Sequence, residues 1–169
     1  MTNILIKLST MAALAVGLTA CGDRFPGGAG GAGGNIGGIQ SGSVNDPTSL
    51  AYFQQTIGDR VLFAVDQSTL SPEATDVLNG QANWLLQNTQ YVVTIEGHAD
   101  EQGTREYNLA LGARRASAVQ NYMVSRGIAD NRVKTLTWGK ERPIEICSSE
   151  DCWSKNRRAV TVVGAGLGS

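Results

Sequence analysis

The segment from Glu96 to Thr104 gathers the side chains best suited to chemistry. It reads Glu-Gly-His-Ala-Asp-Glu-Gln-Gly-Thr and contains His98, the only histidine of the chain. Side chains alternate along an extended backbone, so Glu96, His98 and Asp100 share one face if the segment is a strand end. That grouping raises two possibilities, a metal site and a hydrolase that uses His98 and Asp100.

The rest of the sequence gives both possibilities little support. Hydrolytic zinc sites usually take three protein ligands that include further His or Cys, and the chain has no HExxH motif. It also lacks the GxSxG motif that carries the nucleophile of many serine hydrolases. We therefore expect no catalytic metal, no cofactor and no enzymatic activity. The segment from Glu96 to Thr104 is expected to comprise the end of a strand, a turn and the start of a helix.

A second group of candidate site residues follows on the next predicted helix. Asn108, Leu111 and Arg115 have the spacing i, i+3 and i+7, which places them on one side of a helix. That side can face the turn that carries Asp100. A carboxylate accepts from an ammonium group, and a guanidinium binds a carboxylate with two parallel hydrogen bonds. From the residues alone, a surface charge on the helix is the favoured explanation of Arg115.

Hydrophobic patterning predicts the elements that position these groups. Ser71-Pro72-Glu73 combines a capping side chain, a proline at the first helical position and an acid in the first turn. Gly127 suits a helix C-terminal cap. The pattern predicts strands at 60–65, 91–97, 132–138 and 158–163 and helices at 71–88 and 104–126. The order βαβαββ predicts an α/β (α+β) two-layer sandwich, a mixed sheet with helices on one face.

The N-terminal region has a different character. Residues 1–20 resemble a bacterial export signal, with Lys7 as the only charge and a mainly apolar run at 8–18. That run is too short to span a bilayer, which needs about 20 residues. It ends in Leu-Thr-Ala before Cys21, which resembles the lipobox of bacterial lipoproteins, and an ordinary signal with a chance cysteine is the alternative. We expect lipid on Cys21, and Gly22 after it is compatible with sorting to the outer membrane.

A glycine-rich segment separates the expected anchor from the folded domain. Nearly half of the 21 glycines lie between residues 22 and 42, where no hydrophobic periodicity is present. Such a composition predicts a flexible linker. The predicted organisation is a signal peptide at 1–20, a lipidated N-terminus and linker at 21–46, and one binding domain at 47–169.

Composition excludes several classes of protein. With 14 basic and 15 acidic residues, the net charge of −1 argues against a nucleic-acid binder.

Cys147 and Cys152 enclose four residues in a chain expected to be exported, where disulfides are common. A disulfide is favoured over two free thiols or a metal pair. Arg157 and Arg158 lie beside the last predicted strand, where Arg158 can reach carboxylates of the sheet, so we expect a structural salt bridge from Arg158 rather than contact with a ligand.

An ordered series of motifs resembles the OmpA-like peptidoglycan-binding domain family. The series comprises residues 94–104, 106–109, 111–116, 139–143 and 154–159, and includes the words GHADE and SKNRRA. Where the related pattern usually has an Asp and a Phe, this chain has Ala64 and Val65, a change that affects any contact an aromatic ring supplies there. Asp66 is retained.

The resemblance implies an outer-membrane lipoprotein that faces the periplasm and binds peptidoglycan without cleaving it. Its ligand would be the diaminopimelate of the stem peptide, with Asp100 and Arg115 as the pair for its two charges and Asp66, Asn108 and Leu111 lining the pocket. Neither Asp100 nor Arg115 belongs to the apolar stripe of Leu111, Ala116 and Val119 on the second predicted helix, so substitutions at both positions are expected to leave the fold intact.

The resemblance also implies partners in the Tol system, including the periplasmic propeller protein TolB, and roles in envelope integrity and cell division. A family member outside the Tol system is one alternative. A cell-wall hydrolase that uses His98 and Asp100 is the alternative from a different functional class.

Overall fold

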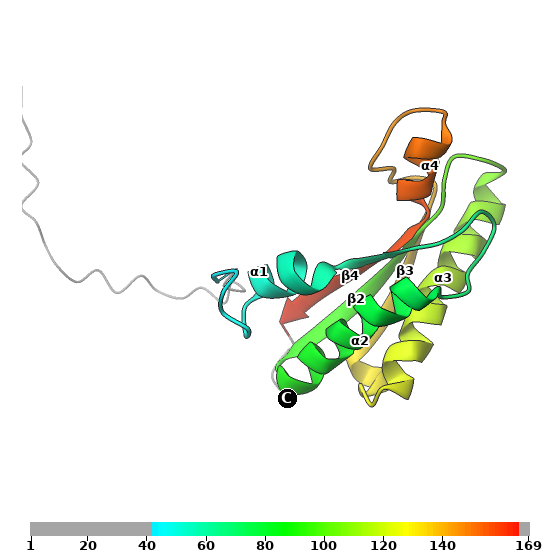
Figure 1. Ribbon diagram of the computed structural model, residues 1–169. Helices are drawn as coiled ribbons and strands as arrows, with labels where there is room; N and C mark the ends of the chain where they lie inside the picture. The colour runs from blue at the N-terminus through cyan, green and yellow to red at the C-terminus, as the bar shows by residue number, and fades with distance from the viewer. Residues whose placement is uncertain (1–41, 166–169) are drawn as a thin grey trace, which may run out of the picture. The chain divides into compact units, whose positions relative to one another are not determined.

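A mixed four-stranded sheet forms the centre of the protein in the computed structural model, which describes residues 42–165. The spatial order of the strands is β1-β4-β2-β3 (Figure 1). The strands are β1 (Arg60–Leu62), β2 (Tyr91–His98), β3 (Val133–Gly139) and β4 (Arg158–Ala165). β2 pairs parallel to β3 and antiparallel to β4, which also pairs antiparallel to β1. The predicted export signal, Cys21 and most of the glycine-rich segment lie outside the described residues.

Two long helices cover one face of this sheet. α2 (Pro72–Gln87) and α3 (Arg105–Ser125) run along the same side of the strands (Figure 1). The predicted two-layer α/β fold with a mixed sheet is therefore confirmed. None of the helices within residues 42–165 is long and apolar enough to cross a bilayer.

Local sequence signals set the helix ends. The Ser71 hydroxyl accepts from the Ala74 N–H at 3.1 Å, as predicted for an N-cap. After α3, Gly127 has a φ of 97° and its N–H donates to the Val124 carbonyl, as expected for a C-terminal cap. The core between helices and sheet includes the fully buried side chains of Phe53, Leu78, Leu85, Ile95, Val119, Met123 and Ile128.

Three short helical segments are additions to the predicted order. α1 (Leu50–Tyr52) continues as a π-helical turn at Phe53–Gly58, a 3₁₀ turn (Asp130–Arg132) precedes β3, and α4 (Glu150–Asn156) lies between β3 and β4. The longest continuous stretch, residues 50–58, has nine residues, too few for hydrophobic periodicity to reveal it.

The first strand is shorter than the sequence predicts. It ends at Leu62 rather than at residue 65, because the chain turns away from the sheet there. The Gln67 N–H donates to the Ala64 carbonyl at 3.2 Å, and Asp66 adopts a left-handed conformation with φ 57°. Asp tolerates this conformation better than most residues. The turn brings residues 64–67 toward the N-terminal half of α3.

Candidate functional site

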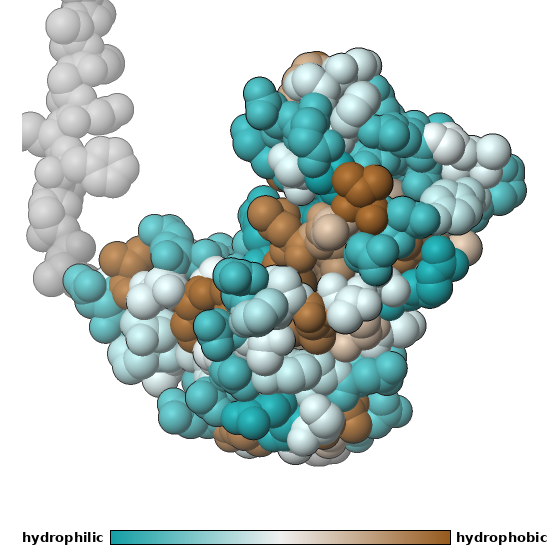
Figure 2. Space-filling view, turned by 45° about the vertical axis from the view of Figure 1, so that its right-hand side comes forward, coloured by the Kyte–Doolittle hydropathy of each residue, from teal (hydrophilic) through white to brown (hydrophobic). Residues whose placement is uncertain are grey.

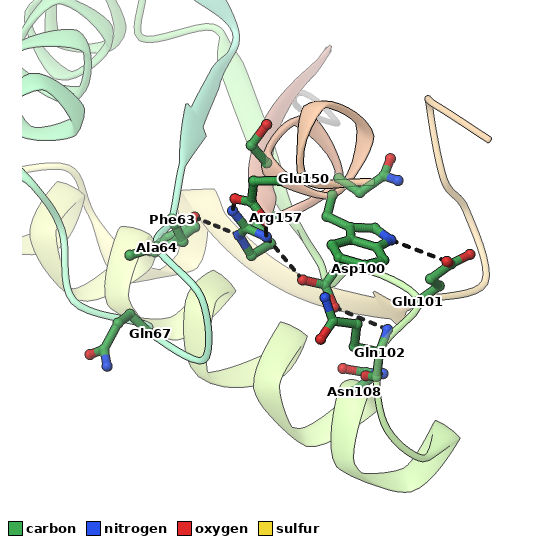
Figure 3. Close-up of polar contacts among 12 residues, drawn as sticks. Phe63, Ala64, Gln67, Asp100, Glu101, Gln102, Asn108, Glu150 and Arg157 are labelled. Carbon is green, nitrogen blue, oxygen red and sulfur yellow. Dashed lines mark hydrogen bonds and ion pairs between the residues drawn. The ribbon is translucent and has the colours of Figure 1, made fainter. Parts of the chain in front are cut away.

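The turn between β2 and α3 presents a buried carboxylate. Asp100 is only 8% exposed. One oxygen accepts from the Gln102 N–H at 3.1 Å and the other from Arg157 Nη1 at 3.2 Å (Figure 3). The turn passes into α3 through Thr104, whose hydroxyl caps the helix by accepting from the Tyr107 N–H. Asp100 is thereby fixed in position before any ligand arrives.

A pocket of about 220 Å³ opens beside this carboxylate. The lining side chains come from three segments, the turn after β1, the turn after β2 and the first two turns of α3. They are Val65, Asp66, Asp100, Gln102, Gly103, Tyr107, Asn108 and Leu111. Four of the five predicted site residues, all except Arg115, therefore lie around one cavity.

The pocket wall is held by polar contacts between these segments. Asn108, 1% exposed, donates from Nδ2 to the Gln102 carbonyl at 2.7 Å. The Tyr107 hydroxyl donates to the Asp66 carboxylate and so links α3 to the turn after β1. Tyr107 itself is 43% exposed and lies on the pocket wall.

Arg115 lies beneath the pocket rather than on its rim. Its side chain is fully buried. Nε donates to the Gln67 carbonyl at 2.8 Å, Nη1 to the His98 carbonyl at 2.8 Å and Nη2 to the Ala64 carbonyl at 3.1 Å. Burial is the largest influence on this group and lowers its pKa to about 10, with Asp100 opposing, so the guanidinium stays charged at neutral pH.

These contacts overturn one expectation from the sequence. Arg115 ties the turn after β1 to the end of β2, so its replacement cannot be neutral for the fold. An explanation as an exposed helix charge is wrong for the same reason. Three of the five guanidinium N–H groups are used by carbonyls, which leaves one on each terminal nitrogen.

Arg157 is a site residue that the sequence pattern did not indicate. It is 4% exposed and bridges Asp100 to Glu150 of α4 (Figure 3), with its Nη1 3.2 Å from Glu150 Oε2. Glu150 is the largest influence in raising the pKa of this guanidinium. These ion pairs of Arg157 lie at the site. The salt bridge predicted for Arg158 is wrong: this buried residue forms no ion pair within residues 42–165, and its Nη2 donates to the Arg142 carbonyl at 3.2 Å.

A close approach of backbones sets α3 over β2. A Cβ added at Gly97 would lie 1.9 Å from the Gly112 carbonyl oxygen, and one added at Gly112 would lie 2.5 Å from Thr137 Oγ1. Neither position has room for a side chain. This pair of glycines therefore determines how near Asn108 and Leu111 come to the turn that carries Asp100.

His98 does not join the pocket. The residue is 2% exposed, neither ring nitrogen has a hydrogen-bond partner among the described residues, and its Nε2 lies 3.8 Å from Glu96 Oε2. Burial, followed by the nearby Arg158 and Arg142, lowers its pKa from 6.5 to about 4. Within residues 42–165, no three His, Cys, Asp or Glu side chains are arranged to hold a metal ion.

The depressed pKa of His98 predicts a pH-dependent stability. Below pH 6.5 the unfolded chain binds a proton that the folded chain does not accept until about pH 4, so stability falls as the pH falls through this window. We expect the free energy of unfolding to decrease by about 2 kcal/mol between pH 7 and pH 5. Urea unfolding at both values measures it. His98→Gln is expected to remove most of this dependence, and an equal slope in the variant would contradict the assignment.

A disulfide closes the loop that leads into α4. Cys147 and Cys152 are bonded, with their Cα atoms 5.7 Å apart. Glu150 lies inside this loop and pairs with Arg157, and Trp153 Nε1 donates to Glu101 at 3.1 Å. The disulfide thus closes the loop that holds Glu150, the partner of Arg157, and that directly precedes Trp153, the partner of Glu101.

We expect thiol titration of the unreduced, denatured protein to find no free sulfhydryl from Cys147 or Cys152. Replacing both with serine should lower the free energy of unfolding by about 2 kcal/mol, the contribution of a short closed loop. The comparison requires equilibrium unfolding of both proteins without reductant. Two reactive thiols in the untreated protein would rule the bond out.

Comparison with known proteins yields consistent matches. The family model described as "OmpA family" matches residues 62–157. The chain is 51% identical over 130 residues to the peptidoglycan-associated lipoprotein of Mesorhizobium japonicum, covering 76% of this chain and 77% of that protein. It is 46% identical over 162 residues to that of Brucella melitensis, covering 95% and 93%.

Solved structures match as well. The peptidoglycan-associated lipoprotein of Burkholderia pseudomallei superposes with a TM-score of 0.64 at 34% identity, covering 72% of this chain and 98% of that one. The C-terminal domain of Helicobacter pylori MotB reaches a TM-score of 0.59 at 17% identity, which indicates a shared fold.

Proposed function

Because this chain belongs to the OmpA family, we propose that it is an envelope lipoprotein that binds peptidoglycan non-covalently. The observation that carries the proposal is the 220 Å³ pocket, which places the Asp100 carboxylate at its wall above the buried Arg115. A pocket that offers a fixed anion close to a fixed cation suits a ligand with both charges on one carbon.

The proposed ligand is the diaminopimelate of the stem peptide, whose side chain ends in an ammonium and a carboxylate. Asp100 accepts from the ammonium group. The carboxylate is attracted by the charge of Arg115, which lies buried beneath the pocket and donates to the carbonyls of Gln67, His98 and Ala64. Asp66, Asn108 and Leu111 enclose the aliphatic part. One such site is of modest strength, and a membrane tether raises the local concentration so that attachment holds.

Hydrolysis of the cell wall is the less favoured alternative. A hydrolase mechanism requires His98 beside the bound ligand, yet His98 is buried and does not line the pocket. Its depressed pKa of about 4 leaves it neutral, and neither ring nitrogen has a partner among the described groups to orient it. Asp100 is likewise engaged by Arg157 and Gln102. These features suit a binding site better than a general base.

A calorimetric titration tests the proposal. The full chain in detergent is titrated with a diaminopimelate-containing stem peptide and with the same peptide containing lysine, which lacks the second carboxylate. We expect the diaminopimelate peptide to bind at least tenfold more tightly, about 1.4 kcal/mol. Mass analysis after the titration should recover it uncleaved. Equal affinities for the two peptides would contradict the proposed recognition of the second carboxylate, and cleavage of the peptide would favour the hydrolase.

We further propose that lipid on Cys21 anchors the protein in the outer membrane with the domain in the periplasm. The motif around Cys21, the glycine-rich segment after it and the relatives named as lipoproteins support this arrangement. The proposed cellular partners are the proteins of the Tol system, TolB included, with roles in envelope integrity and cell division.

The anchor has a direct test. Cys21→Ser removes the thiol that would receive the lipid, so the product is expected either to be released from the membrane or to keep its signal segment. Fractionation and mass determination distinguish these products, and Thr19→Ser, which keeps the cysteine, serves as control. A fully cleaved Cys21→Ser protein that stays with the outer membrane after a high-salt wash would contradict the anchor.

A further inference from the structure

A second, larger hollow lies away from the proposed peptidoglycan pocket. It has a volume of about 490 Å³ and shares none of its lining residues with that pocket. Its apolar surface comes from β1, the first half of α2 and the loop before α4, through Val61, Leu62, Ala74, Val77 and Ile144. Figure 2 shows apolar side chains gathered in a hollow on this side of the molecule.

One wall of this groove is a free sheet edge. β1 is the outermost strand, and on its inner side the Thr161 N–H donates to the Asp59 carbonyl and the Phe63 N–H to the Arg157 carbonyl. Backbone groups alternate in direction along a strand, so Arg60 and Leu62 direct their N–H and C=O groups outward. No group within residues 42–165 bonds to them there. Both residues line the groove.

The charges at the groove are unequally satisfied. Arg60 pairs with Asp59 at 2.7 Å and Lys155 pairs with Glu145 at 3.1 Å. Glu73, at the start of α2, has no cation within ion-pair distance in the described part of the chain. The groove therefore offers an unpaired carboxylate beside its apolar wall and unpaired backbone groups along its edge.

We propose that this groove binds an extended segment of a partner protein, which adds a strand to β1. The outward backbone groups of Arg60 and Leu62 supply the ladder, as in other cases of strand addition. Alternate side chains of the added segment are apolar and face Ala74 and Val77, since successive side chains of a strand point to opposite faces. A lysine or arginine at one end pairs with Glu73.

The test uses a defined probe and the full chain in detergent. The probe is a fluorescein-labelled Lys-Val-Thr-Val-Thr-Val peptide, and its control has proline in place of both threonines, which removes two N–H donors. Fluorescence anisotropy should give at least tenfold weaker binding for the control. Comparable binding of the two peptides would overturn strand addition.

Two substitutions localise the binding. Ile144→Asp places a charge in the groove and is expected to weaken the probe at least tenfold. Ile146→Asp, the same change at a side chain that is 92% exposed and does not line the groove, should alter it less than twofold. Glu73→Lys should weaken binding of the probe and strengthen binding of the same peptide with glutamate in place of its lysine. Equal affinities across these proteins would remove the groove as the site.

Hydrogen exchange identifies the occupant. Without probe, the amides of Arg60 and Leu62 should exchange at least tenfold faster than that of Val61, and saturating probe should slow them by a similar factor. If they are protected without probe in a concentration-dependent dimer, the occupant is a second copy. If protection instead depends on the presence of residues 1–41, it is the chain's own segment. Either result overturns the proposal, and neither bears on stem-peptide binding.

Discussion

Replacing Asp100 with asparagine should reduce binding of a diaminopimelate stem peptide by about ten- to hundredfold, the equivalent of one charge-assisted hydrogen bond. The substitution keeps the shape of the side chain but removes the charge that the ligand's ammonium group requires. Calorimetric titration against the unchanged protein measures the effect. The lysine-containing peptide should lose affinity by a similar factor, because it carries the same ammonium group.

The same substitution also acts on the free protein. Asp100 pairs with Arg157, so Asp100→Asn should lower the free energy of unfolding by about 1–3 kcal/mol. Circular dichroism at the titration temperature establishes that the variant is folded. Glu101→Gln is the matched control, since it removes a neighbouring charge that does not line the pocket. If Asp100→Asn binds as tightly as Glu101→Gln, the pocket is not the peptidoglycan site.

Replacing Arg115 with methionine should destabilise the fold by about 3 kcal/mol or more. Methionine fills similar volume but leaves the carbonyls of Ala64, Gln67 and His98 without their donor, and each unsatisfied buried group costs about 1–3 kcal/mol. Urea unfolding measures the loss. The stability of Arg115→Lys should lie between those of the unchanged protein and Arg115→Met. The lysine ammonium group keeps the charge, but unlike the planar guanidinium it cannot reach all three carbonyls.

Arg114 provides the control for this series. It is the adjacent residue on α3 but is exposed, with its guanidinium 5.9 Å from the Tyr107 ring centroid. Arg114→Met should change the free energy of unfolding by less than about 0.5 kcal/mol, as is usual for surface substitutions. Equal stability losses at the two positions would mean that the buried contacts of Arg115 do not hold the turn after β1 against the sheet.

Much of the fold was predictable because local signals agree with the tertiary structure. The cap at Ser71, the alternation in β2 and the glycine after α3 each act over a few residues, so the sequence locates them to within about two positions. The spacing of Asn108 and Leu111 after Asp100 likewise placed them around one pocket. The sequence pattern did not predict α4, because a seven-residue helix has too few turns to show a repeat of hydrophobic residues.

What the tertiary structure alone decided is the environment of the charges. The helical spacing that groups Arg115 with Leu111 does not specify whether a turn 48 residues earlier in the chain covers it, yet the Gln67 carbonyl does so. Arg157 reaches Asp100 across 57 residues because β4 lies beside β2, which is a property of the strand order. Residue types and local spacing thus determined which groups could bind a zwitterion. Burial and pairing between distant segments determined which of these side chains can contact a ligand.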